Sequence, residues 1–156
     1  MHTASAHSAV RVFRVIQGMS LVTAVFGMFH RETLARTRLI GSFISSDYVL
    51  LLECALLGQI VQLEGEPLFQ RRIHPQMSRQ ANKTEMEVLR WFDPEARSKL
   101  TSRQRLYLEY LKSIYGIDGL NAVERQLCAA SLVGSIVSRR ARVAAGRWRR
   151  QLFSGS

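Results

Sequence analysis

Three groups of side chains in this sequence are of a type that can do acid–base chemistry or bind charged ligands. The first is Asp47, which follows Ser45 and Ser46 and precedes a leucine-rich segment. A carboxylate in the first turn of a helix is stabilised in its ionised form by the helix dipole and the free N–H groups, which favours a low pKa. Such a carboxylate can accept a proton from a hydroxyl group as a general base. The alternative is an ordinary aspartate at a helix start.

The second group surrounds the end of a predicted strand over residues 68–74. Arg71, Arg72 and His74 lie close together there and are followed by Ser78. Two guanidinium groups and an imidazole can bind a phosphate or a metal-bound diphosphate. The alternative is a solvated edge strand whose basic side chains prevent pairing with another sheet.

The third group is a basic C-terminal segment. The chain has a net charge of +10, and no acidic residue follows Glu124. Val133, Ile136, Val137 and Trp148 alternate with arginines in this segment. A helix with this pattern can lie on an anionic membrane or contact nucleic-acid phosphates. It can also be a terminal helix with a solvated basic face.

Several function classes find no support in the sequence. No apolar run reaches the roughly 18 residues of a membrane-spanning helix. The nearest, residues 18–29, follows Arg11 and Arg14 like a signal peptide but lacks a cleavage motif. The two cysteines lie in apolar helical patterns, which favours a reducing compartment over a disulfide framework. Glycine-rich phosphate loops, H-E-x-x-H, G-x-S-x-G, Asp-x-Asp and nucleic-acid-binding signatures do not occur.

Hydrophobic periodicity predicts a mixed first part and a helical second part. Strands are predicted over residues 21–29, 60–63 and 68–74 because they are rich in β-branched and aromatic residues or alternate in polarity. Helices are predicted over residues 10–17, 32–38, 47–57, 85–92, 103–115 and 121–153. Ser45 or Ser46 is expected to cap the third of these, and Gly58 to end it. The fold class expected is therefore α/β (α+β), with a short mixed sheet in residues 1–95 and an arginine-rich helical extension in residues 96–156.

Four segments in order resemble bacterial family 2 glycosyltransferases. They are VFGMFHRETL (25–34), TRLIGSF (37–43), SDYVLLLECALLG (46–58) and PLFQRRIHPQMS (67–78), and WFDP (91–94) is also similar. In that family a strand with an FG-x-x-R pattern precedes a helix, and a loop leads to an aspartate heading a leucine-rich helix. A strand ending in R-x-H-P and a serine then follows. The match covers residues 25–94.

The resemblance implies the acceptor-side portion of a GT-A fold. By position, Asp47 matches the family's catalytic base and His74 a residue that approaches the metal. Arg71, Arg72 and Ser78 are possible contacts to the donor diphosphate. The family often has Glu-Asp where this chain has Ser46-Asp47, so a helper carboxylate is absent. A complete enzyme would use a nucleotide-sugar donor, Mn²⁺ or Mg²⁺, and a glycan or lipid-linked acceptor.

The main departure from the family is the missing nucleotide-binding half, which would precede residue 25. We therefore expect the chain to be inactive alone. Three explanations stay open: the gene is truncated, its start is misassigned, or the nucleotide-binding half is a separate chain. The expected location is the cytoplasm or the inner face of the membrane. The alternative function is a small basic helical protein that binds nucleic acid or anionic membrane, of which nucleic acid is the less favoured. The donor sugar, the acceptor and the oligomeric state do not follow from the sequence.

Overall fold

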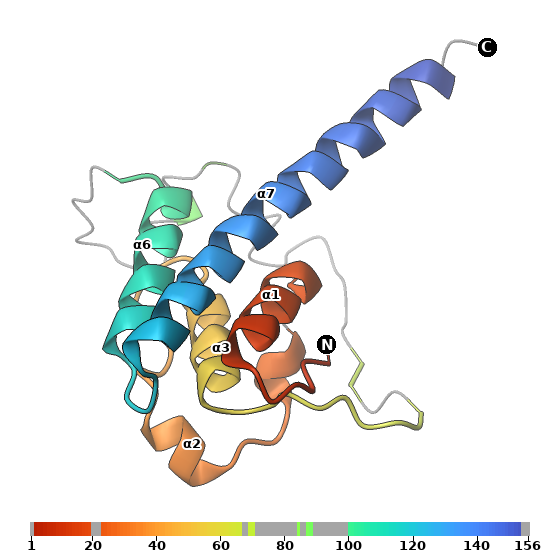
Figure 1. Cartoon of the computed structure of the whole chain (residues 1–156). Helices are drawn as coiled ribbons and strands as arrows, with labels where there is room; N and C mark the ends of the chain where they lie inside the picture. Colours follow the sequence, from red (N-terminus) through yellow and green to blue (C-terminus); the bar gives the residue numbers. More distant parts are fainter. Residues whose placement is uncertain are drawn as a thin grey trace.

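The computed structural model describes residues 2–19, 23–66, 69–70, 84, 87–88 and 100–153, with side chains described as far as residue 146. The described elements are all helical (Figure 1), and their labels follow that figure. They are α1 (Ser8–Gly18), the 3₁₀ helix η1 (Thr23–Phe26), α2 (Arg31–Ala35), α3 (Ser46–Leu57), α6 (Ser102–Gly116) and α7 (Ala122–Phe153). No described helix is long and apolar enough to cross a bilayer.

The predicted α/β architecture, a partial GT-A-like domain with a short mixed sheet, is wrong, because the described residues are all helical and contain no strand. In place of the strand predicted over residues 21–29, Thr23–Phe26 forms a 3₁₀ helix. Residues 60–63 have no regular structure. The Thr3 amide donates to Ile60 O at 2.8 Å, and the Ile60 amide donates to the Thr3 side-chain oxygen, also at 2.8 Å. A strand forms only where a neighbour satisfies its backbone groups, so β-rich composition without a partner does not produce a sheet. Most of the strand predicted over residues 68–74 lies outside the described residues.

Helix positions follow local signals. The described helices agree closely with five of those predicted, and the helix predicted over residues 85–92 lies mostly outside the described residues. α1 buries Val12, Val15, Ile16 and Met19, a set with the i, i+3, i+4, i+7 spacing of one helix face. α6 begins with a capping box in which Thr101 and Gln104 bond each other's backbone N–H groups. Such caps satisfy N–H groups that have no partner within the helix, and they fix where the helix begins.

α3 is the central helix of the structure. Every residue from Val49 to Leu56 is buried, including Glu53. The helix contacts α1, α2, α6 and η1, so it has neighbours on all its faces. A helix that is apolar around its whole circumference is stable only when it is enclosed in this way. Because the middle of α3 is buried, only the ends of this helix can contribute to a site on the surface.

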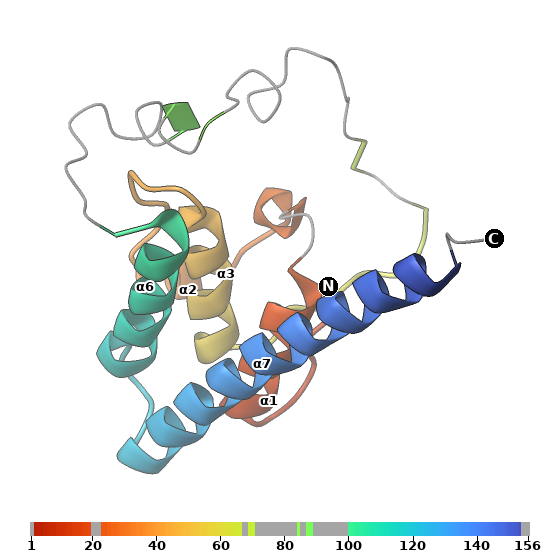
Figure 2. The same cartoon turned by 90° about the horizontal axis from the view of Figure 1, so that it is seen from above.

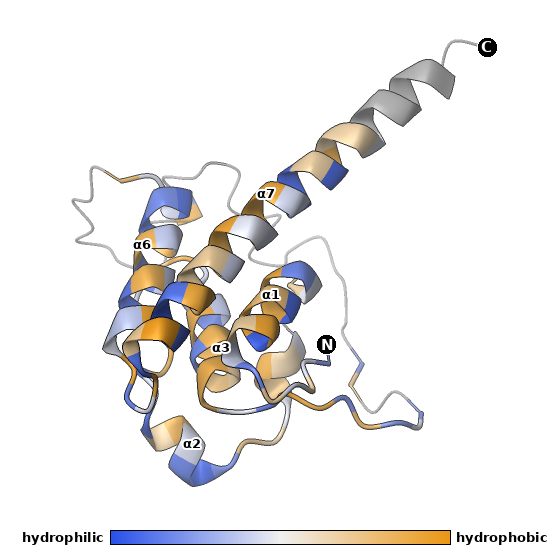
Figure 3. Ribbon diagram, viewed as in Figure 1, coloured by the Kyte–Doolittle hydropathy of each residue, from blue (hydrophilic) through white to orange (hydrophobic). Residues whose placement is uncertain are grey.

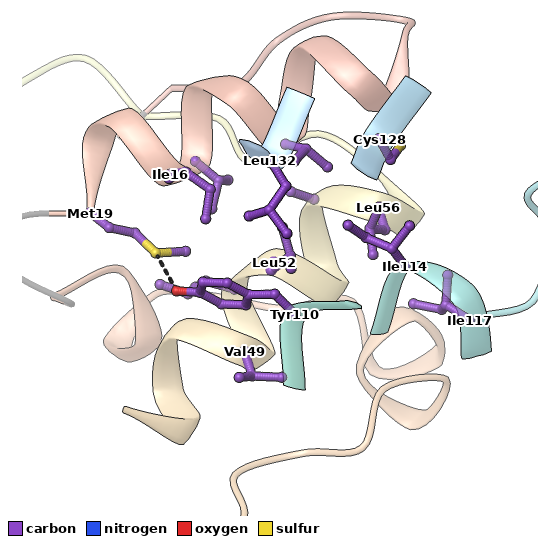
Figure 4. Close-up of a cluster of buried hydrophobic side chains, with 14 residues drawn as sticks. Ile16, Met19, Val49, Leu52, Leu56, Tyr110, Ile114, Ile117, Cys128 and Leu132 are labelled. Carbon is purple, nitrogen blue, oxygen red and sulfur yellow. Dashed lines mark hydrogen bonds between the residues drawn. The ribbon is translucent and has the colours of Figure 1, made fainter. Parts of the chain in front are cut away.

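One hydrophobic core joins the helices on both sides of the boundary expected at residue 95. In Figure 2, α7 lies across α1, and α6 lies beside α3. Figure 3 shows hydrophobic residues where these helices meet. Leu52 of α3, Ile114 of α6 and Leu132 of α7 are almost inaccessible to solvent and belong to this cluster (Figure 4). The N-terminal half of α7 is thus part of the core, and its C-terminal half projects past the other helices (Figure 1).

Three arginines bind the C-terminal ends of helices other than their own. Arg11 donates to the end of α3, Arg125 to the end of α6 and Arg139 to the end of α1. The acceptors are the carbonyl oxygens of Ala55, Leu56, Ile114, Ile117 and Met19, at distances between 2.6 and 3.0 Å. Cations are favourable at helix C-termini, where carbonyl groups lack partners. Part of the excess positive charge is therefore used inside the fold.

Candidate functional site

Asp47 lies in the first turn of α3, as predicted, at the end of the loop over residues 39–45. The residue that starts the helix, Ser45, has a left-handed backbone conformation with a φ of 67°. Its side chain makes no capping hydrogen bond, so the predicted serine cap is not formed. A left-handed conformation is costly for a residue other than glycine, and such strain is often retained at functional sites.

The surroundings of Asp47 reverse the direction expected for its pKa. Burial raises the pKa of the half-buried carboxyl above its ordinary value, although hydrogen bonds from the backbone amides of Tyr48 and Asp47 oppose this. The Tyr48 amide donates to Asp47 Oδ1 at 3.0 Å. None of the ion pairs among the described residues includes Asp47. A carboxylate with a raised pKa and no cationic partner is a better proton acceptor near neutral pH than an ordinary aspartate.

A polar network built on two buried carboxylates holds the other end of the loop that leads to Asp47. Arg38 Nε donates to Glu53 Oε1 of α3, and Arg38 Nη1 donates to Glu109 Oε2 of α6, both at 2.7 Å. The Arg38 backbone amide donates to the second oxygen of Glu53, also at 2.7 Å. Ser113 Oγ donates to Glu53 Oε1 at 2.8 Å. Through these bonds Arg38 fixes the start of the loop to two core helices.

Charge pairing dominates the electrostatics of this network. Desolvation by burial alone would lower the pKa of Arg38, but its bonds and charge attraction to Glu53 and Glu109 outweigh burial and raise it. Desolvation would likewise raise the pKa of Glu109, but Lys112 and Arg38 outweigh it and lower the pKa. Both groups are therefore held in their charged forms.

A cavity of about 900 Å³ opens beside the start of α3, between α6 and α7. Ser45 and Tyr48, which are close neighbours of Asp47 in sequence, form part of its wall, although Asp47 itself does not. α6 and α7 meet at the connection over residues 117–121 and diverge from there (Figure 1), and the C-terminal end of α1 lines the cavity as well. The volume is within the range typical of ligand sites.

The cavity wall combines basic, aromatic and apolar side chains. Its charged residues are Arg103, Arg139 and Arg140, and no acidic residue lines it. Its tyrosines are Tyr48, Tyr107 and Tyr110. The apolar part of the wall consists of Ile16, Met19, Leu106, Ile136, Val143 and Ala144. A wall of this composition favours an anionic ligand that also has apolar surface.

The predicted site residues other than Asp47 lie outside the described residues. These are Arg71, Arg72, His74 and Ser78. The structure therefore does not test whether they approach Asp47. Within its described part, no three histidine, cysteine, aspartate or glutamate side chains lie close enough together to hold a metal ion. The described residues thus do not themselves form the divalent-ion site that the resemblance implies.

The sequence analysis did not identify the residues of α6 and α7 that line the cavity. On α6 these are residues 102, 103, 106, 107 and 110, and on α7 residues 136, 139, 140, 143 and 144. Apart from Ser102, both sets follow the i, i+3, i+4, i+7 spacing of one helix face. The helical spacing of the lining residues was therefore visible in the sequence. However, two mixed basic and apolar faces can be matched to each other only once the helices are placed.

Asp47 is held by a strained loop beside a basic, aromatic-lined cavity, and comparison with known proteins does not add to this description. Neither a protein-family model, nor a curated protein, nor a solved structure matches the chain. The family resemblance therefore rests on the sequence motifs alone.

Proposed function

We propose that this chain is the acceptor side of an inverting glycosyltransferase and that Asp47 is its general base. The complete enzyme transfers a sugar from a nucleotide-sugar donor to a hydroxyl group of a glycan or lipid-linked acceptor. The donor is bound by a part of the enzyme outside these 156 residues. The proposal combines the ordered motifs of the sequence with the surroundings of Asp47.

In the proposed reaction Asp47 removes the proton from the acceptor hydroxyl. The acceptor oxygen forms a bond to the anomeric carbon on the face opposite the leaving group, which inverts the configuration there. The bond from that carbon to the diphosphate breaks at the same time, and the nucleoside diphosphate leaves with the electron pair. The Asp47 carboxyl then releases the proton to solvent. A divalent ion in the complete enzyme would stabilise the charge of the leaving diphosphate.

The observation that carries the proposal is the half-buried Asp47 carboxylate, which is in none of the ion pairs of the described residues and whose sequence neighbours Ser45 and Tyr48 line a ligand-sized cavity. A carboxylate with a raised pKa, in a position beside a cavity, is a frequent feature of catalytic sites. The helix N-terminus by itself would instead favour the ionised form and lower the pKa of an aspartate at this position. The cavity also offers room for an acceptor on the same side of α3 as Tyr48.

Transfer activity of the chain combined with its donor-binding half tests the proposal. We expect Asp47→Asn to reduce the rate by about 10²–10⁴-fold with donor binding unchanged, since the amide keeps the shape but cannot accept a proton. Asp118→Asn is the matched control, because Asp118 is exposed and uses its backbone carbonyl to bind Arg36. The chain alone should show no turnover with nucleotide sugars and manganese. A near-normal rate for Asp47→Asn, or turnover by the chain alone, would contradict the proposal.

A second candidate function is binding of an anionic membrane surface by α7. This helix continues beyond the core, and the segment from Ser138 to Phe153 contains six arginines and no acidic residue. Basic residues near an anionic leaflet contribute about 1 kcal/mol each. The two functions are compatible, since a transferase acting on lipid-linked acceptors would work at the inner face of a membrane.

A further inference from the structure

The strongest unused feature of the structure is the uncompensated positive charge of the cavity between α6 and α7. The side chains of Arg103 and Arg140 line it, are exposed to solvent, and form no hydrogen bond or ion pair in the described part of the chain. Arg139 is anchored, because its Nη2 donates to the carbonyl oxygen of Met19 at 2.7 Å. Like charges around one cavity repel each other, and an anion bound between them would remove that cost.

The two helices supply this charge from opposite sides. Arg103 lies in the first turn of α6, and Arg139 and Arg140 lie in the middle of α7. Guanidinium groups bind phosphate oxygens through pairs of parallel N–H donors. An anion between the helices would therefore be contacted from both walls, whereas an anion on the exposed tail would meet α7 alone.

The rest of the wall fits an apolar chain. Six lining residues are aliphatic or thioether side chains, and Tyr48 and Tyr107 add half-buried rings. The hydroxyl of the buried Tyr110 donates only to the sulfur of Met19, at 3.5 Å (Figure 4). A thioether is a weak acceptor, so this hydroxyl can exchange that bond for a stronger one to a ligand oxygen. A cavity for a small inorganic anion would not need so large an apolar wall.

We infer that this cavity binds a phosphate-bearing amphiphile, with the phosphate between Arg103 and Arg140 and the hydrocarbon chain along the apolar wall. As a statement about a ligand, the inference stands on the cavity alone. As a statement that the acceptor is lipid-linked, it rests on the proposed function. The same chemistry can come from a free amphiphile or from a lipid in a bilayer.

Calorimetric titration of the full chain tests the inference with three soluble probes. Dodecyl phosphate below its micelle concentration carries both chain and anion, dodecyl maltoside only the chain, and inorganic phosphate only the anion. We expect dodecyl phosphate to bind at least about tenfold more tightly than either of the others, because each loses one class of contact. Inorganic phosphate binding as tightly as dodecyl phosphate would reduce the cavity to a simple anion site and overturn the inference.

Paired variants locate the binding. Arg103→Gln combined with Arg140→Gln should weaken dodecyl phosphate at least about tenfold, a change of 1.4 kcal/mol. The matched control is Arg142→Gln, which removes an exposed arginine of α7 that does not line the cavity, and it should change affinity less than twofold. Equal losses of dodecyl phosphate affinity in the double variant and in Arg142→Gln would assign binding to the basic helix in general and overturn the inference. Thermal unfolding of each variant verifies that it remains folded, since neither Arg103 nor Arg140 bonds the core.

Vesicles distinguish the two sources of the ligand. If the amphiphile comes from a bilayer, the parent should bind phosphatidylglycerol vesicles more tightly than the double variant. If it is free, both should bind the vesicles equally while differing toward dodecyl phosphate. Binding of dodecyl phosphate without sugar transfer by the complete enzyme would refute only the proposed function. Asp47-dependent transfer without dodecyl phosphate binding would refute only this inference.

Discussion

Replacing Arg38 by alanine should destabilise the whole domain, because it removes the main partner of a buried carboxylate. The side chain of Glu53 is 2% exposed, and it accepts hydrogen bonds from Arg38 Nε, from the Arg38 amide and from Ser113 Oγ. Removing one partner of a buried ion pair costs about 3–5 kcal/mol. The amide and the Ser113 hydroxyl remain as donors after the substitution, and Arg38 itself is 46% exposed, so we expect the lower end of that range.

A loss of about 3 kcal/mol is a large part of the roughly 5–15 kcal/mol that stabilises a domain. For a chain of this size each kcal/mol lowers the midpoint of thermal unfolding by about 2–4 °C, so the expected decrease is about 6–12 °C. Urea unfolding followed by far-ultraviolet circular dichroism measures the free energy, and calorimetry measures the midpoint. Arg36→Ala is the control, because the exposed Arg36 makes one bond, to the Asp118 carbonyl oxygen, and should cost below about 1 kcal/mol.

A second substitution separates the pair from its surroundings. Combining Arg38→Ala with Glu53→Leu removes both charges, and buried pairs replaced by apolar residues are often neutral in stability. The double variant should therefore recover most of the free energy lost in Arg38→Ala. If Arg38→Ala loses less than about 1 kcal/mol, or if the double variant is less stable than the single one, the role assigned to this network is wrong.

Three further predictions concern charge. Asp47→Asn should raise the free energy of unfolding at neutral pH. The raised pKa means that the fold favours the neutral carboxyl, so the contribution of Asp47 to stability is present at low pH and is lost as the pH rises through its folded pKa. Urea unfolding checks this, and a loss of about 0.3–1 kcal/mol would indicate a plain helix-dipole role instead. The lowered pKa of Glu109 acts in the opposite direction. Its contribution to stability is present above the ordinary pKa of 4.5 and is lost as the pH falls through the folded pKa. Glu109→Gln should therefore weaken the dependence of the free energy of unfolding on pH on the acid side. Co-sedimentation with anionic vesicles should decrease with added salt and with Trp148→Ala plus Phe153→Ala, because apolar contacts matter in lipid and little on phosphates. Unchanged sedimentation of that double variant, or tighter binding of duplex DNA at equal salt, would refute membrane binding by α7.

Features that depend on a few neighbouring residues could be predicted from the sequence. The leucine-rich run gave the position of α3, and Asp47 lies in its first turn as predicted. The start of α6 follows from Thr101 and Gln104, which satisfy each other's backbone N–H groups. In each case the atoms that interact are within a few turns of one another, so their spacing specifies the interaction.

Tertiary structure decided the features that depend on distant neighbours. Residues 23–26 have the composition of a strand but form a 3₁₀ helix, because a strand requires a partner that composition cannot supply. The pKa of Asp47 is raised where the helix N-terminus alone would lower it, because burial depends on packing around α3. The net charge of +10 indicates affinity for anions, but Arg11, Arg125 and Arg139 bind backbone carbonyl oxygens at helix ends. Only the placement of the helices separates these structural arginines from Arg103 and Arg140, whose side chains bind no other group in the described part of the chain.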